Sequence, residues 1–118
     1  QKWAFYPFTR RGTNLAALKT QLESLKTEGI NHIIYVANMM TTMFGSVDDL
    51  SAITALLKEA EMTFKVHVDG AYGGFVYPFI SKKFEHTFKN PDVSSITLDA
   101  HKMVQAPYGT GIFFAVKT

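Results

Sequence analysis

The feature that most constrains the fold is a regular alternation of strand-like runs with helical stripes. The runs cover residues 30–37, 63–69 and 95–98, and the first is almost continuously apolar. Between them, apolar residues recur at helical spacing, at positions 15, 18, 22 and 25 and again at 50, 53, 56 and 57. A continuous apolar run is typical of a strand covered on both faces, as in a parallel sheet. The alternation therefore predicts an α/β fold, a mostly parallel sheet with flanking helices.

The ends of these elements carry local signals. Thr13 or Asn14 is expected to cap the first helix, and Asp48 the second. Residues 2–9 are expected to be extended, residues 75–93 irregular, and residues 111–116 a last strand. His32 lies inside the first apolar run and is expected to be a packed core histidine.

Size and composition exclude several functional classes. The chain has 118 residues, a net charge of +2 and no cysteine, which suits one small domain in a reducing compartment. No apolar run approaches the roughly 20 residues that cross a bilayer, and the first residues do not form a signal peptide. Short basic doublets without interleaved aromatics predict no nucleic-acid partner.

A lysine stands at an unusual place. Lys102 follows the strand-like run 95–98 within the stretch Asp99-Ala100-His101-Lys102, and precedes the turn-rich loop at residues 106–111. At the rim of a sheet, partial burial disfavours an ammonium ion and makes the amine available as a nucleophile. The same placement suits a lysine that holds a carbonyl cofactor as a Schiff base.

Other polar side chains fall at the ends of the predicted strands. His67 and Asp69 are two residues apart on one strand and therefore face the same side. In open α/β sheets the working residues collect at the carboxyl ends of the strands, so Asp69 and Lys102 are expected to form a polar pair in a crevice. The alternatives are a structural ion pair that closes the sheet edge, and a metal-dependent hydrolase whose ligands are His67, Asp69, Asp99 and His101.

Four segments together carry a family resemblance. They are residues 41–50 (Thr-Thr-Met-Phe-Gly-Ser-Val-Asp-Asp-Leu), residues 67–74 (His-Val-Asp-Gly-Ala-Tyr-Gly-Gly), residues 95–102 and residues 106–111. In this order they resemble the pyridoxal-phosphate-dependent amino-acid decarboxylases, the group of the aromatic amino-acid, tyrosine and glutamate enzymes. Gly70, where many relatives carry alanine or serine, and Met103-Val104 after the lysine depart from the family pattern.

The resemblance implies a role for each matching residue. Lys102 matches the lysine that attaches the cofactor, and Asp69 the carboxylate that pairs with the ring nitrogen. Ala71 matches the small residue against one face of the ring. Thr42, His101 and His67 match family residues close to the cofactor, and Thr41 is the neighbour of Thr42 in the matched segment.

The resemblance also implies a function and a setting. The fold would be part of the large domain of a fold-type I enzyme of the aspartate aminotransferase type. The reaction would be the decarboxylation of an L-amino acid with pyridoxal 5'-phosphate, by a cytoplasmic homodimer. Residues 1–118 are expected to be a fragment of the cofactor-binding large domain, without the phosphate-cup segment and the C-terminal small domain, and to be inactive alone. A carbon–carbon lyase of the sphingosine-phosphate lyase type and a non-catalytic relative are the remaining alternatives.

Overall fold

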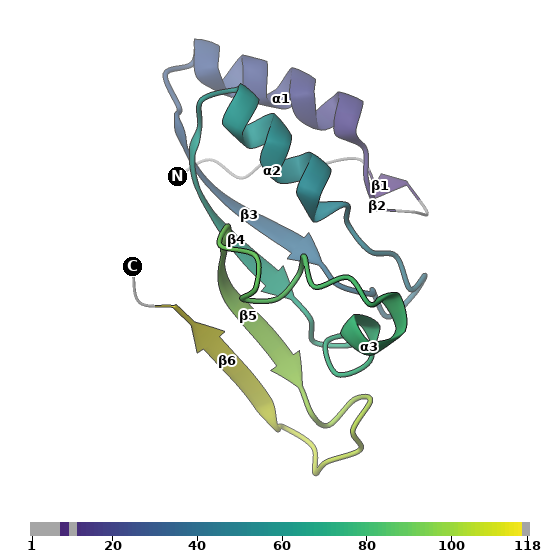
Figure 1. Cartoon of the computed structure of the whole chain (residues 1–118). Coiled ribbons are helices and arrows are strands. Elements are labelled where there is room, and N and C mark those ends of the chain that lie inside the picture. Colours follow the sequence, from purple (N-terminus) through teal and green to yellow (C-terminus); the bar gives the residue numbers. More distant parts are fainter. Residues whose placement is uncertain (1–7, 10–11, 117–118) are drawn as a thin grey trace.

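The computed structural model describes residues 8–9 and 12–116. Its main feature is a four-stranded sheet in the order β3-β4-β5-β6 (Figure 1). The strands are β3 (His32–Asn38), β4 (Thr63–Asp69), β5 (Val93–Asp99) and β6 (Gly111–Ala115). The pairs β3–β4 and β4–β5 are parallel, whereas β5–β6 is antiparallel. A short antiparallel pair, β1 (Phe8–Thr9) with β2 (Gly12–Thr13), precedes it. The predicted mostly parallel α/β sheet is confirmed.

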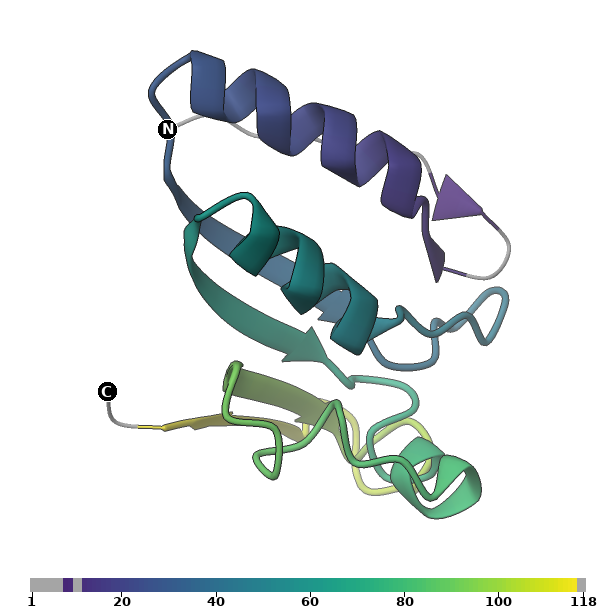
Figure 2. The same ribbon diagram turned by 45° about the horizontal axis from the view of Figure 1, so that its top comes forward.

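Two helices lie on one face of this sheet, as the two ribbon views agree (Figures 1 and 2). Helix α1 (Leu15–Thr27) is capped by Asn14, whose side chain accepts a hydrogen bond from the amide of Ala17. Helix α2 (Leu50–Glu59) is capped by Asp49, which accepts from the amide of Ala52. The sequence predicted Asp48 as this cap, and that prediction is wrong because Asp48 is buried and bonded elsewhere.

The hydrophobic core lies between these helices and the sheet. Leu18, Leu22, Ile53 and Leu57 are almost completely buried, and each is worth about 1.5–3 kcal/mol relative to an exposed position. Strand residues that point the same way complete the core, namely Tyr35, Ala37, Val66, Val68 and Ile96. The predicted helical stripes therefore face the sheet.

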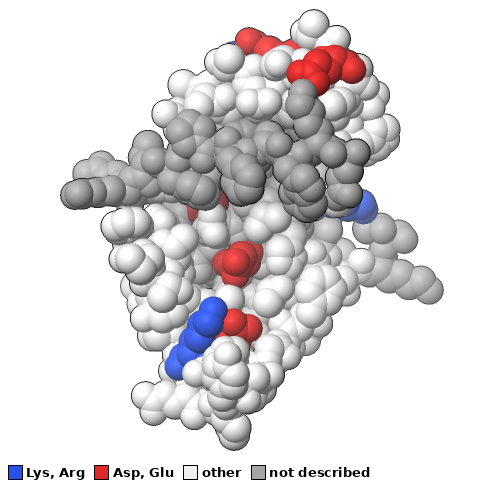
Figure 3. All heavy atoms as spheres, turned by 180° about the vertical axis from the view of Figure 1, so that it is seen from behind, with Lys and Arg blue, Asp and Glu red and all other residues white. Residues whose placement is uncertain are grey.

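The opposite face of the sheet is open in the described part of the chain. Ile34 is 78% exposed and Val36 is 52% exposed, and both point away from the helices. His32 is also exposed rather than packed in a core. The expectation that the first strand is covered on both faces is wrong here, because both long helices lie on the same side. Seen from behind, most of the described surface is uncharged (Figure 3).

The segment between β4 and β5 is only partly irregular. It contains the short helix α3 (Tyr77–Ser81) and a series of turns. Its first turn packs closely on the sheet, because a Cβ at Gly73 would overlap Met40 Cβ and the carbonyl oxygen of Met39. A Cβ at Gly74 would overlap Leu98. The two glycines therefore let residues 70–74 lie against the ends of β3 and β5.

Candidate functional site

The ends of three strands meet around one cavity of about 210 Å³. Because β3, β4 and β5 are parallel, their carboxyl ends lie at the same edge of the sheet. The cavity is lined by Asn38, Met40, Thr41, Thr42, Asp69, Ala71, Tyr72 and Lys102. Four of the six predicted cofactor residues are therefore brought together, namely Asp69, Ala71, Thr42 and Lys102.

Asp69 is the last residue of β4, and the turn that follows fixes its carboxylate. Its Oδ1 accepts a hydrogen bond of 3.0 Å from the amide of Ala71. The neighbouring amide of Gly70 donates a hydrogen bond to the carbonyl of Thr97 on β5, and this bond fixes the start of the turn. No hydrogen bond within the described residues engages Asp69 Oδ2, so this oxygen is available to a ligand in the cavity.

Lys102 lies in the first turn after β5 and reaches the same cavity. Its Nζ forms an ion pair of 2.9 Å with Asp99 Oδ2, and its side chain is 34% exposed. The sequence predicted a pair with Asp69, which the structure corrects. Asp99 is three residues earlier on the same turn, and the amide of Lys102 donates to its carbonyl, so it is the nearer carboxylate. Lys102 and Asp69 share the cavity without pairing.

Thr41 and Thr42 lie in the loop after β3 and differ in what they contact. Thr41 Oγ1 is 2.7 Å from Ser46 Oγ and accepts from the amide of Ser46 at 3.1 Å. It therefore stabilises the loop, although it also lines the cavity. Thr42 lines the cavity with no comparable hydrogen bond among the described residues.

The two predicted histidines do not line the cavity. His67 lies two residues before the end of β4. Its ring nitrogens form hydrogen bonds with the hydroxyl of Ser95 at 2.8 Å and with the hydroxyl of Thr97 at 3.2 Å. It stacks on Phe113 with ring centroids 5.8 Å apart. His101 Nδ1 donates to the carbonyl of Thr110 at 3.3 Å, and its ring lies 5.3 Å from that of Tyr108.

The alternative of a metal site finds no support in this geometry. Among residues 8–9 and 12–116, no three histidine, aspartate or glutamate side chains are grouped so that they could hold a metal ion. His101 Nε2 is 3.9 Å from Asp99 Oδ2, and both ring nitrogens of His67 are hydrogen-bonded to hydroxyl groups.

Of the described helices, none is both long and apolar enough to span a bilayer.

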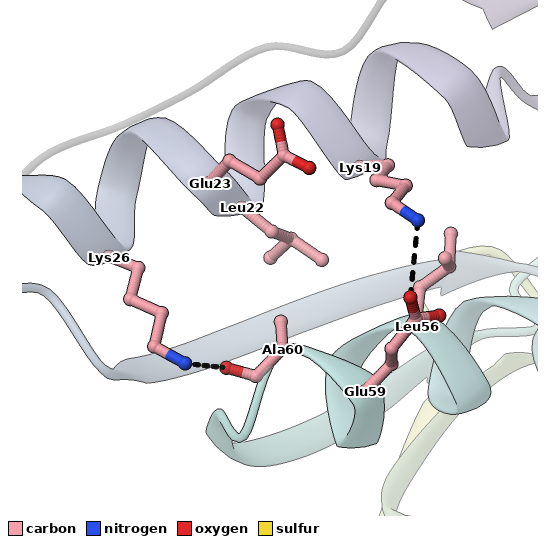
Figure 4. A pocket seen from close by; sticks show the side chains of 7 residues that line it. All are labelled: Lys19, Leu22, Glu23, Lys26, Leu56, Glu59 and Ala60. Atoms are coloured by element: carbon pink, nitrogen blue, oxygen red, sulfur yellow. Dashed lines mark hydrogen bonds and ion pairs between the residues drawn. The ribbon is translucent and has the colours of Figure 1, made fainter.

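A second cavity, of about 180 Å³, lies between α1 and α2 (Figure 4). Its cations are already paired, since Lys19 Nζ is 3.1 Å from Glu59 Oε1 and Lys26 Nζ is 3.2 Å from the carbonyl of Ala60. Lys26 also pairs with Glu61 at 2.8 Å. These interactions connect the two helices, and the carboxylate of Glu23 also lines this cavity.

Sequence reasoning missed Asn38, which ends β3 and lines the first cavity beside Asp69. The signal was present, because the rule that selected Asp69 and Asp99 as strand ends applies equally to Asn38. Tyr72 also lines the cavity, whereas Tyr77 packs against the core and the ring of His86.

Comparison with known proteins decides the family. The pyridoxal-dependent decarboxylase conserved domain matches residues 5–117. The chain belongs to the pyridoxal-dependent decarboxylase family. The resemblance of the four sequence segments is thereby confirmed. Some of the segments that carry this resemblance also line the cavity.

Several relatives are named as decarboxylases of amino acids. The chain is 49% identical over 100 residues to a tryptophan decarboxylase of Clostridium sporogenes, an alignment that covers 85% of this chain and 24% of the relative. It is 37% identical over 91 residues to a probable L-aspartate decarboxylase of Archaeoglobus fulgidus, covering 77% of this chain and 24% of the relative. The chain thus spans about a quarter of the length of the curated relatives it matches.

Solved structures support the fold. A crystal structure of mouse CSAD in apo form superposes with a TM-score of 0.73 at 23% identity, over 95% of this chain and 23% of that one. Oryza sativa TDC with PLP superposes with a TM-score of 0.68 at 24% identity, over 88% of this chain and 21% of that one. The decarboxylase-family chain therefore has the fold of part of these larger proteins.

Proposed function

We propose that this chain contributes the cofactor lysine and the ring-nitrogen carboxylate of a pyridoxal-phosphate-dependent decarboxylase, which converts an L-amino acid to an amine and carbon dioxide. The observation that supports the proposal is the cavity that contains Asp69, Ala71 and Lys102 together. A carboxylate favours a protonated ring nitrogen, and a lysine amine forms a Schiff base with a carbonyl. The small side chain of Ala71 leaves room for a flat ring.

The residues present fit one side of such a site. Asp69 Oδ2 is an acceptor turned to no described partner, and Lys102 supplies the amine. The cavity of about 210 Å³ is smaller than the roughly 300–1,000 Å³ of complete small-molecule pockets. This size suits a chain that spans about a quarter of its relatives and supplies part of the pocket.

Each residue has a defined task in this proposal. Asp69 Oδ2 would accept a hydrogen bond from the protonated ring nitrogen, while the amide of Ala71 holds Oδ1 in place. Asp99 Oδ2 forms an ion pair of 2.9 Å with Lys102 Nζ and thereby holds the lysine side chain at the cavity. The cofactor, when bound, supplies an electron sink for the bond to the departing carboxyl group. His67, His101 and Thr42 are proposed as residues close to the cofactor, on the family match alone.

The test is an assay of the full-length protein that contains this chain. Purified enzyme is incubated with tryptophan, tyrosine and aspartate, the substrates in the names of its relatives, and carbon dioxide and amine are measured. Lys102→Ala is expected to abolish steady turnover, whereas Lys89→Ala, an exposed lysine away from the cavity, retains it. Full turnover by Lys102→Ala would refute the assignment. Release of an aldehyde without carbon dioxide would favour the carbon–carbon lyase instead.

We also propose the setting of the enzyme. Residues 1–118 are assigned to the cofactor-binding large domain of a longer protein that acts as a cytoplasmic homodimer. The lack of cysteine is compatible with a reducing compartment. Met43 is 81% exposed, Phe44 69% and Phe79 79%, and a subunit interface would bury apolar side chains such as these. Light scattering of the full-length protein tests the dimer, and a monomeric active enzyme would contradict it.

A further inference from the structure

A buried carboxylate lies behind the cavity and holds the end of β3. Asp48 is only 1% exposed, and each of its two carboxylate oxygens accepts two hydrogen bonds. Oδ1 accepts from the amide and the hydroxyl of Thr13, both at 2.7 Å. Oδ2 accepts from the backbone amide of Asn38 at 2.7 Å and from its side-chain Nδ2 at 3.2 Å. The main chain adds a further bond, since the amide of Asp48 donates to the carbonyl of Asn38.

This arrangement fixes the orientation of the Asn38 side chain. An ionised carboxylate only accepts hydrogen bonds, so the nitrogen of the Asn38 amide, and not its oxygen, must face Asp48. A flipped amide would place two acceptors against each other in a buried site, which is costly. The oxygen Oδ1 therefore lies on the edge of the amide that is turned away from Asp48, and no hydrogen bond of the described residues engages it.

Asn38 also lies beside the carboxylate that is proposed to bind the ring nitrogen. Asn38 and Asp69 are register partners on β3 and β4, and both line the cavity. The pairing is fixed by the strand ends, since the amide of Met39 donates to the carbonyl of Asp69 at 2.9 Å. Two acceptor groups from adjacent strands thus border the same part of the cavity.

Resting on the proposed function, we propose that Asn38 is an additional cofactor-binding residue, whose Oδ1 accepts a hydrogen bond from the protonated ring nitrogen together with Asp69. A pair of acceptors, one of them charged, favours the protonated ring over the neutral ring. Asp48 is then a positioning residue, because it keeps the amide oxygen and not the amide nitrogen toward the cavity. A nitrogen in that position would oppose a protonated ring.

The test compares two ligands on the full-length apoenzyme. One ligand is pyridoxal phosphate, and the other is its analogue in which carbon replaces the ring nitrogen. Asn38→Ala is expected to raise the dissociation constant of pyridoxal phosphate by about tenfold, the size expected for one hydrogen bond to a charged donor. The dissociation constant of the analogue, which has no donor at this position, is expected to stay within about twofold.

Two further variants keep the test decisive. Asn38→Ser retains a hydroxyl that can donate to Asp48 but is too short to reach the ligand, so it replaces Asn38→Ala if that variant fails to fold. Asp49→Asn, at the exposed helix cap, is the control with wild-type affinity for both ligands. An equal loss of affinity for both ligands, or no loss of affinity for pyridoxal phosphate, overturns the role of Asn38 and leaves the proposed function standing. Failure of the wild-type protein to bind pyridoxal phosphate overturns the proposed function as well.

Discussion

Replacing the buried carboxylate by an amide, Asp48→Asn, is expected to loosen the structure behind the cavity. Each oxygen of Asp48 accepts two hydrogen bonds, from Thr13 on one side and Asn38 on the other. An amide keeps one oxygen and turns an NH₂ group toward the other pair of donors. If the NH₂ group faces Thr13, the hydroxyl can rotate to accept and one bond is lost. If it faces Asn38, two bonds are lost.

The magnitude follows from this count. A hydrogen bond to a charged group contributes about 1.5–3 kcal/mol, so the loss of one to two bonds lowers the free energy of local opening by about 1.5–6 kcal/mol. Amide exchange that depends on this opening becomes about tenfold faster or more. Hydrogen–deuterium exchange mass spectrometry of the full-length protein measures it, in peptides that cover residues 12–14 and 36–39.

The neighbouring residue provides a matched control. Asp49 carries the same side chain, is exposed, and caps α2 through one bond to the amide of Ala52. Because asparagine caps helices about as well as aspartate, Asp49→Asn is expected to exchange like the wild type. Exchange in Asp48→Asn within about threefold of the wild type would refute the reasoning, since it would mean that the four bonds contribute almost nothing.

Three further predictions concern stability and binding. Burial lowers the pKa of His86, whose ring is 1% exposed, below its usual value. The unfolded chain therefore binds the proton more readily than the folded chain does. The contribution of His86 to thermal stability is complete above about pH 6.5 and is lost as the pH drops below it, by at most about 1.4 kcal/mol per pH unit. His86→Gln is expected to flatten this dependence, and an unchanged pH profile would contradict the assignment. Leu57→Ala, at a fully buried site, is expected to cost about 2–5 kcal/mol in thermal or urea unfolding, and the half-buried Leu56→Ala distinctly less; equal costs would contradict the described packing. Gly73→Ala is expected to push the turn away from the end of β3 and weaken cofactor binding in a titration, and wild-type affinity would show that this close contact does not shape the cavity.

Much of the fold was accessible from sequence because local signals agreed with the global pattern. The leucine stripe of α1 is a local signal and was predicted, and its cap, Asn14, is one of the two residues that the sequence offered. The parallel sheet followed from the alternation of strands and helices. The meeting of Asp69 and Lys102 in one cavity followed from the rule that the carboxyl ends of parallel strands share an edge.

What the sequence could not give depends on three-dimensional neighbours. Asp48 and Asp49 are adjacent aspartates, and nothing local shows which one caps the helix and which one is buried against Thr13 and Asn38. The partner of Lys102 was likewise a matter of distance, since Asp99 on its own turn lies closer than a carboxylate on another strand. The apolar pattern of β3 predicted two covered faces, whereas the described helices cover one.

The central claim is that Lys102 attaches the cofactor, and chemical mapping tests it most directly. The full-length protein is loaded with pyridoxal phosphate, reduced with borohydride, digested and analysed by mass spectrometry. The reduced cofactor is expected on the peptide that contains Lys102, and Lys102→Ala is expected to carry none. A label on another lysine, or no stable label on the wild-type protein, would contradict the account.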